Sequence, residues 1–212
     1  MSTMNTKDIG LFPLFAWPLM RHMLADKQDA NQTLLTIVQN EPLRDNQGNL
    51  IHSAIDILER SELKSLKDDI LEHVSFYARD VLAYQDIEIE LTQSWINVTV
   101  PGQHHHIHRH TNSIISGTYY PFGVDQSPIV FHNPNTFQFV PNVDEDNQNP
   151  VSMISKNCIY VSPNPSELML WLSPMVHGVK KNESENNRIS LSFNVMIRGY
   201  VGHPESLSGV RL

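Results

Sequence analysis

The chain has 212 residues, of which 40% are hydrophobic and 18% are charged, a composition typical of a folded globular protein. Its formal net charge of −8 disfavours general nucleic-acid binding, because proteins that bind the phosphate backbone concentrate lysine and arginine. The single cysteine, Cys158, excludes an intrachain disulfide framework and a cysteine-based structural zinc site.

The sequence shows no signal for secretion or for membrane insertion. The first eight residues lack the basic region and the apolar stretch of a signal peptide. No segment approaches the roughly 20 consecutive apolar residues of a membrane span. We therefore expect a cytoplasmic protein with no membrane partner.

Helices are predicted mainly in the first 85 residues. Residues 9–17 are apolar and contain a proline, which favours an edge strand or an extended lead-in. Residues 29–40 show helical spacing of apolar side chains, with Asp29 as the expected N-cap. A turn signal follows at 46–49. The strongest amphipathic helical pattern runs from 61 to 84.

Strands are predicted after residue 86, in short segments rich in β-branched and aromatic residues and separated by Pro, Gly and Asn. The predicted strands are 87–100, 113–120, 129–132, 158–161, 168–172 and 188–200. This spacing indicates a sandwich or barrel. The fold class expected is mainly β with N-terminal helices (α+β), in which the helices pack on one sheet.

We expect one domain over residues 1–212. In this division, 1–85 give mostly helical support, 86–200 form the β core and 201–212 form a tail. Residues 141–150 carry an acidic run and are predicted to be a long exposed loop. Whether that loop is simply solvated or gates a site stays open.

The predicted strands alternate apolar and polar side chains, which point to opposite faces of a sheet. The apolar face of the last strand, expected to pack on the helices, carries Ile189, Leu191, Phe193, Val195 and Ile197. Its polar face carries Arg188, Ser190, Ser192 and Asn194. Two other strands continue this polar set with Trp95, Asn97, Thr99, Ser116, Thr118 and Tyr120. The polar face either lines a barrel pocket or is solvated, as in a one-sided antiparallel sheet.

A histidine run at 103–110 holds five of the eleven histidines. Neutral imidazole is the commonest protein ligand for transition metals, so a metal site competes here with a polar loop. In an extended chain the even-numbered histidines share one face, and two of them one residue apart can bind one metal ion. A third ligand must come from elsewhere. The best candidate is His177, which precedes a glycine, and the competitor is His132.

Arg188 lies 11 positions after His177 on the polar face of the last predicted strand. The guanidinium group is a rigid bidentate partner for a carboxylate. Burying it inside a barrel is costly without an anionic partner. The partner is either an ordinary acidic side chain or an anionic ligand.

Together these motifs resemble a family of bacterial and phage oxygenases within the 2-oxoglutarate and Fe(II)-dependent superfamily. The resemblance spans essentially the whole chain, and it depends on the order and spacing of motifs that are weak singly. The matching motifs are Leu11-Phe12-Pro13, Ser94-Trp95-Ile96-Asn97-Val98, Gly102, His108-Arg109-His110-Thr111-Asn112-Ser113, Ser116-Gly117-Thr118-Tyr119-Tyr120, Pro174-Met175-Val176-His177-Gly178-Val179 and Arg188-Ile189-Ser190-Leu191-Ser192-Phe193-Asn194.

The resemblance implies a double-stranded β-helix, the cupin-like jelly roll, and an Fe(II)- and 2-oxoglutarate-dependent dioxygenase that hydroxylates a substrate and releases succinate and CO₂. It implies His108, His110 and His177 as the metal ligands. Arg188 is implied to pair with the distal carboxylate of 2-oxoglutarate, and Ser190 to hydrogen-bond to it. Tyr120 and Asn97 are further candidate contacts to the cosubstrate or substrate, on strand parity alone.

The sequence departs from the superfamily pattern where His110 replaces the usual Asp or Glu. Three neutral imidazoles also suit zinc or copper, so the native metal stays open. The crowded histidines permit a shifted pair, His106 and His108. A Pro165-Ser166-Glu167 turn replaces the expected Pro-Gly, which affects loop shape.

Two other functions compete with the oxygenase. One is a cupin-like metalloprotein that does not use 2-oxoglutarate, and the other is a non-catalytic jelly-roll binding module. The expected partner is a small-molecule or peptidyl substrate, which the sequence does not identify. Exposed sheet edges permit a homodimer, but nothing in the sequence defines its interface.

Overall fold

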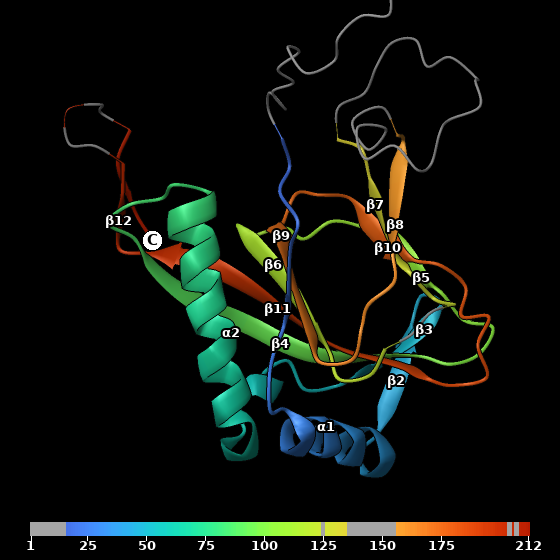
Figure 1. Ribbon diagram of the computed structural model, residues 1–212. Coiled ribbons are helices and arrows are strands. Elements are labelled where there is room, and N and C mark those ends of the chain that lie inside the picture. Colours follow the sequence, from blue (N-terminus) through green and yellow to red (C-terminus); the bar gives the residue numbers. More distant parts are fainter. Residues whose placement is uncertain (1–15, 124–125, 135–155, 203–204, 206–207) are drawn as a thin grey trace, which may run out of the picture.

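Two stacked β-sheets form the body of the protein, and two helices cover the outer face of the larger sheet (Figure 1). This computed structural model describes residues 16–123, 126–134, 156–202, 205 and 208–212. The lead-in predicted at 9–17 lies outside these residues except at its end, and the predicted loop at 141–150 lies outside them entirely.

The larger sheet has seven strands in the order β1-β9-β6-β11-β4-β3-β2. Their bounds are β1 Met20–Met23, β2 Leu43–Asn46, β3 Asn49–His52, β4 Glu88–Thr99, β6 Ile115–Tyr120, β9 Glu167–Leu172 and β11 Arg188–Arg198. All neighbours pair antiparallel, and the central pair of β4 and β11 is the longest.

The smaller sheet has four antiparallel strands in the order β5-β10-β7-β8. Their bounds are β5 His105–His108, β7 Ile129–His132, β8 Cys158–Val161 and β10 His177–Val179. From β4 to β11 the chain passes repeatedly between the two sheets, which is the topology of a double-stranded β-helix. The predicted fold class is therefore confirmed. A separate short pair, β12 Tyr200–Val201 and β13 Val210–Arg211, lies near the C-terminus.

The helical segments lie before β4, as the sequence predicted. Helix α1 spans Gln28–Asn40, and α2 spans Lys64–Phe76 after the 3₁₀ turns η2 Ile57–Glu59 and η3 Ser61–Leu63. The helix predicted over 61–84 therefore has a 3₁₀ start, and it ends in a π-helical turn, η4 Tyr77–Val81. The predicted N-cap at Asp29 is wrong, because the cap is Lys27 and Asp29 lies in the first turn.

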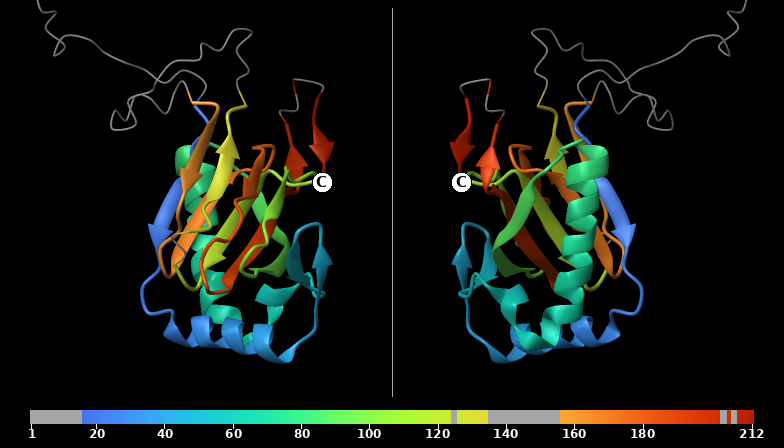
Figure 2. Two further views of the ribbon diagram at one scale, coloured as in Figure 1. Left: turned by 90° about the vertical axis from the view of Figure 1, so that its right-hand side faces the viewer. Right: turned by 90° about the vertical axis from the view of Figure 1, so that its left-hand side faces the viewer.

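The helices bury their apolar stripes against the apolar face of the large sheet, and Figure 2 shows both helices on that side. From the helices, Leu34, Leu66, Ile70 and Val74 join one core, and from β11, Ile189, Leu191, Phe193 and Val195 join it. Burying each large aliphatic side chain stabilises the fold by about 1.5–3 kcal/mol. The apolar face predicted for the last strand is confirmed for these four β11 residues.

Three short strands in the N-terminal part escaped the sequence analysis. β1 pairs with β9 at one edge of the large sheet, and the β2–β3 hairpin pairs with β4 at the other. The turn predicted at 46–49 connects this hairpin, with Gln47 and Gly48 both at positive φ. In the described part of the chain, no helix is long and apolar enough to cross a membrane.

Gly117 allows β6 and β11 to pack tightly under the helices. A Cβ atom at this position would lie 2.6 Å from Leu170 Cδ2 and would also overlap the Phe193 ring. Both of those side chains are fully buried, so neither can move into solvent. A side chain at Gly117 would therefore overpack the core.

We predict that Gly117→Ala lowers the free energy of unfolding by about 1–3 kcal/mol, the usual cost of overpacking a core. Urea denaturation of the variant and the wild type measures the difference. The double variant Gly117→Ala/Phe193→Leu removes the clashing ring atoms and should recover part of the loss. If Gly117→Ala were as stable as the wild type, close packing at this position would be disproved.

Candidate metal centre

Three histidines from the small sheet and its connection meet at one point. His108 ends β5, His110 follows two residues later, and His177 begins β10 directly opposite His108 in the strand register. One ring nitrogen from each lies within 4.8 Å of the other two. The structure thus brings together the three histidines that the resemblance implied as ligands. Their role as metal ligands stays a prediction.

The hydrogen bonds of the three imidazoles fix which nitrogen is free. His108 Nδ1 lies 2.9 Å from the His106 carbonyl oxygen, and His177 Nδ1 lies 2.9 Å from that of Met175. His110 Nδ1 lies 2.6 Å from Asn194 Oδ1. Since these oxygens only accept, each Nδ1 carries the proton and donates it. Each Nε2 therefore keeps a lone pair that a metal ion can accept.

The burial of these rings favours the neutral form that metal binding requires. Burial, followed by the charge of His108, lowers the pKa of His177 to about 3. The same causes, opposed by the hydrogen bond to Asn194, lower the pKa of His110 to about 4. Burial also lowers the pKa of His108, against the hydrogen bond to the His106 carbonyl. The three imidazoles are thus neutral at physiological pH.

This donor set fits a divalent first-row metal ion. Imidazole suits iron, zinc, copper and nickel, and three neutral nitrogens on one side leave other coordination positions for ligands. No carboxylate joins the group in the part of the chain that the structure describes. The donor set is therefore neutral, as the sequence indicated from His110.

The other histidines of the run do not share this point. His106 and His105 group with His108 but not with His177. His105 was expected to point away, but its ring centroid lies 4.6 Å from that of His108 because a bulge shifts the register between β5 and β10. His132 lies at the end of β7 and belongs to no metal-binding group among the described residues.

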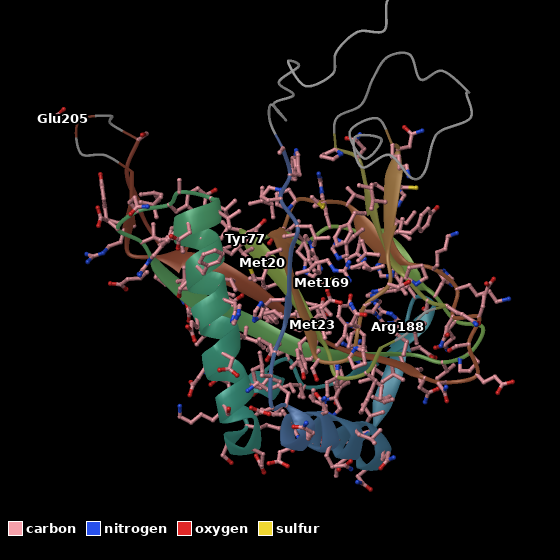
Figure 3. All side chains as sticks on the ribbon, viewed as in Figure 1. Met20, Met23, Tyr77, Met169, Arg188 and Glu205 are labelled. Carbon is pink, nitrogen blue, oxygen red and sulfur yellow. The ribbon has the colours of Figure 1, made fainter. Side chains whose placement is uncertain are left out.

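Arg188 is buried on the polar side of the large sheet, with 2% of its surface exposed (Figure 3). Nε donates to the Ser127 carbonyl at 3.1 Å, Nη1 to Ser190 Oγ at 3.2 Å and Nη2 to Tyr120 Oη at 3.2 Å. None of the ion pairs found among the described residues involves Arg188. A buried cation without a carboxylate partner indicates an anion-binding position.

Several polar groups around Arg188 share its side of the sheet. Burial raises the pKa of Tyr120, although the charge of Arg188 opposes the shift, so Tyr120 remains a phenol. Asn97 donates to Ser192 Oγ at 3.2 Å, and its Oδ1 lies 3.5 Å from Asn49 Nδ2. Their contacts to a cosubstrate stay predictions.

Among the described residues, three buried side-chain polar atoms have no hydrogen-bond partner: His106 Nδ1 and two atoms on residues to which sequence reasoning gave no role. Those two atoms are Thr99 Oγ1, on the residue paired with Arg188 in the register, and Trp171 Nε1. The Trp171 ring packs edge-on to His177, with 5.0 Å between centroids. Such orphaned groups are rare in protein interiors and suggest a missing ligand. In the sequence, the alternation of side chains along the strand is the only signal that places Thr99 on the same polar face as Arg188.

A polar cleft of about 320 Å³ opens beside the histidines. Its lining residues are Asn46, Ile51, Gln93, Trp95, His105, His106, His108, Arg109, His110, Thr111 and Asn194. Trp95 stacks on His110 at 5.6 Å between centroids. The cleft gives a bound molecule access to two of the three clustered imidazoles.

The β core is similar in sequence to a family of enzymes. Residues 93–194 match the family described as "Putative 2OG-Fe(II) oxygenase". This segment contains the three clustered histidines and Arg188. A comparison with curated protein sequences gave no match.

Solved structures whose descriptions name 2-oxoglutarate (α-ketoglutarate) share the fold. The epimerase SnoN from nogalamycin biosynthesis superposes with a TM-score of 0.60 at 11% identity, covering 84% of this chain and 76% of SnoN. HygX from Streptomyces hygroscopicus, with nickel, 2-oxoglutarate and hygromycin B bound, gives 0.59 at 10% identity, covering 84% and 82%. EctD from S. alaskensis, with 2-oxoglutarate and 5-hydroxyectoine bound, gives 0.57 at 12% identity, covering 84% and 71%.

We predict that Asn194→Ala weakens metal binding about 10- to 100-fold, since it removes the acceptor that orients His110. Titration with Co(II) or Ni(II) measures the affinity. Asn194→Asp is the matched control, because it keeps an acceptor oxygen and should bind at least as tightly as the wild type. Equal affinities for wild type and Asn194→Ala would show that this hydrogen bond does not orient the ligand.

We also predict that the metal-free protein loses stability as the pH falls from 6.5 toward 4. The folded-state pKa values of His177 and His110, about 3 and about 4, lie below the ordinary value of 6.5. Below pH 6.5 the unfolded chain therefore binds protons that the folded chain does not, at up to about 1.4 kcal/mol per pH unit for each group.

Denaturant unfolding at pH 7, 6, 5 and 4 tests this dependence. His177→Phe should reduce this dependence by the contribution of one group, whereas the same change at the exposed His104 should leave it unchanged. An unfolding free energy that stays constant from pH 7 to 4 would contradict neutral burial of these rings.

Proposed function

We propose that the chain, whose residues 93–194 match the 2OG-Fe(II) oxygenase family, is an oxidoreductase of that type and hydroxylates a C–H bond of its substrate. The proposed cosubstrates are 2-oxoglutarate and O₂, and the proposed metal is Fe(II). One oxygen atom enters the new hydroxyl group. The other enters succinate as 2-oxoglutarate loses CO₂.

His108, His110 and His177 would hold the iron through their Nε2 atoms. When bound, the iron supplies the activation of O₂ and the oxidative chemistry. The protein's own contribution is to orient the imidazoles through the acceptors of His106, Met175 and Asn194. His106 and Asn194 lie on strands and Met175 lies in the turn that leads into β10, so the ligand positions are set before metal binds.

Arg188 is the observation that carries the 2-oxoglutarate assignment. Its guanidinium donates to hydroxyl and carbonyl oxygens and lies 5.0 Å from the centroid of the Tyr120 ring, so the distal carboxylate of 2-oxoglutarate would be its anionic partner. Ser190 and Tyr120 lie within hydrogen-bond distance of the guanidinium and would share that carboxylate. The unpartnered Thr99 Oγ1 supports the same position. In a metalloprotein that does not use 2-oxoglutarate, the buried Arg188 would have no anionic partner among the described residues.

The test is anaerobic calorimetry of 2-oxoglutarate binding to the Fe(II)-loaded protein, followed by aerobic measurement of succinate. We expect binding that depends on the metal. We also expect slow succinate formation without a prime substrate. Absence of 2-oxoglutarate binding under these conditions would overturn the proposal.

We predict that Arg188→Ala weakens 2-oxoglutarate binding about 30-fold or more, because truncating one partner of a buried charge pair costs about 2–5 kcal/mol. Metal stoichiometry should not change, since Arg188 is not part of the histidine group. Arg188→Lys keeps the charge and should recover part of the affinity. Wild-type affinity in Arg188→Ala would assign Arg188 a structural role.

A further inference from the structure

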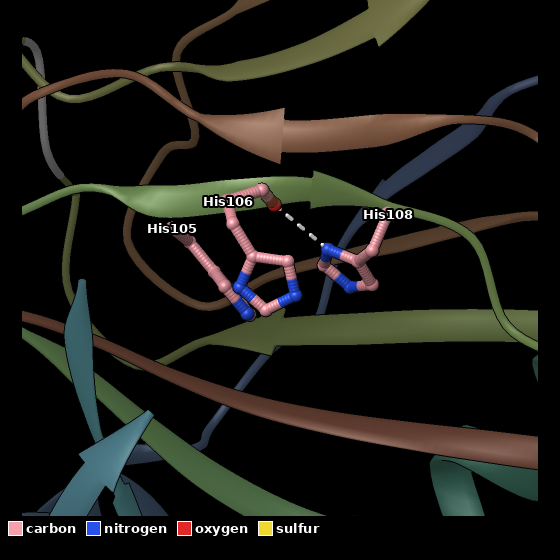
Figure 4. Close-up of side chains that lie close together, drawn as sticks. All are labelled: His105, His106 and His108. Atoms are coloured by element: carbon pink, nitrogen blue, oxygen red, sulfur yellow. Dashed lines mark hydrogen bonds between the residues drawn. The ribbon is translucent and has the colours of Figure 1, made fainter. Parts of the chain in front are cut away.

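A second group of three imidazoles lies beside the first. His105, His106 and His108 place one ring nitrogen each within 4.8 Å of the others. Their ring centroids are 4.6 to 4.9 Å apart, and Figure 4 shows the rings gathered along β5. This group shares only His108 with the proposed iron site.

The bulge in the small sheet creates this group. His177 pairs with His108, and Val179 pairs with His105. Between these two pairs β10 advances by two residues and β5 by three, so β5 carries one extra residue. Consecutive side chains alternate faces in a regular strand, but a bulge breaks that alternation. Gly178 permits the close approach, since a Cβ there would lie 3.1 Å from the His105 carbonyl oxygen.

The nitrogens of this group are available to a ligand. His106 Nδ1 is buried without a hydrogen-bond partner, which is unfavourable unless something else binds there. His105 Nε2 accepts a hydrogen bond from Asn46 Nδ2 at 3.4 Å, so this nitrogen carries a lone pair, which a metal ion takes by displacing the amide. All three rings line the open cleft, so an ion can reach them from solvent.

We propose that His105, His106 and His108 form a second, solvent-accessible position for a divalent transition-metal ion of the zinc or nickel class. Three neutral imidazoles suit these metals. Because His108 Nδ1 donates to the His106 carbonyl, only its Nε2 remains, and one lone pair binds one ion. The two positions therefore exclude one another. Zinc at the second position removes a ligand from the iron site, and this consequence rests on the proposed function.

The variant His110→Ala/His177→Ala tests the second position alone, because it removes two ligands of the first and none of the second. Titration with Co(II) should give one ion per chain with ligand-field absorption. Adding His106→Ala should abolish that absorption, whereas adding His104→Ala, an exposed neighbour outside the group, should not. No Co(II) binding by the folded double variant would overturn the proposal.

A second measurement uses the intact site, so that the result does not depend on how well the double variant folds. Wild-type protein should bind one Co(II) in total, since the positions compete, and two tightly bound ions would contradict exclusion. Zinc should release 2-oxoglutarate from the Fe(II) protein at lower concentration in wild type than in His106→Ala. Equal zinc sensitivity would contradict the second position. Failure of 2-oxoglutarate to bind at all would instead refute the oxygenase function and leave the Co(II) result standing.

Discussion

The site depends on the pairing of β10 with β5, which places His177 opposite His108. Two histidines far apart in sequence reach one point only because these strands share this register. A shift by one residue would turn His177 to the other face of the sheet. The helices pack on the apolar face of the large sheet. This sheet supplies Asn194, which orients His110.

The sequence predicted the β core well because its strands are short and their alternation is regular. The predicted bounds of β7 and β8 match the structure, and those of β4, β6, β9 and β11 differ from it by at most two residues at either end. The strands β1, β2, β3, β5 and β10 were missed because, unlike the equally short β7 and β8, they carry no run of β-branched and aromatic residues. The helix over 61–84 was predicted as continuous because periodicity does not register 3₁₀ or π turns.

Parts of the site were beyond sequence reasoning for physical reasons. Strand parity assumes a regular strand, so the bulge that moves His105 beside His108 was invisible to it. The unpartnered atoms of Thr99 and Trp171 could not be predicted, because the hydrogen-bond partner of a hydroxyl or an indole depends on which residues the fold packs around it. Arg188 was identified by its place on a polar face, but its lack of a carboxylate partner required the structure.

The central claim is that three imidazoles and a buried arginine hold a metal ion and 2-oxoglutarate together. A crystal structure of the protein grown anaerobically with Fe(II) and 2-oxoglutarate tests it most directly. The account predicts iron bound to the Nε2 atoms of His108, His110 and His177, with the distal carboxylate of 2-oxoglutarate on Arg188 and Ser190. A structure in which that carboxylate lies away from Arg188, or in which His177 does not bind the metal, would contradict it.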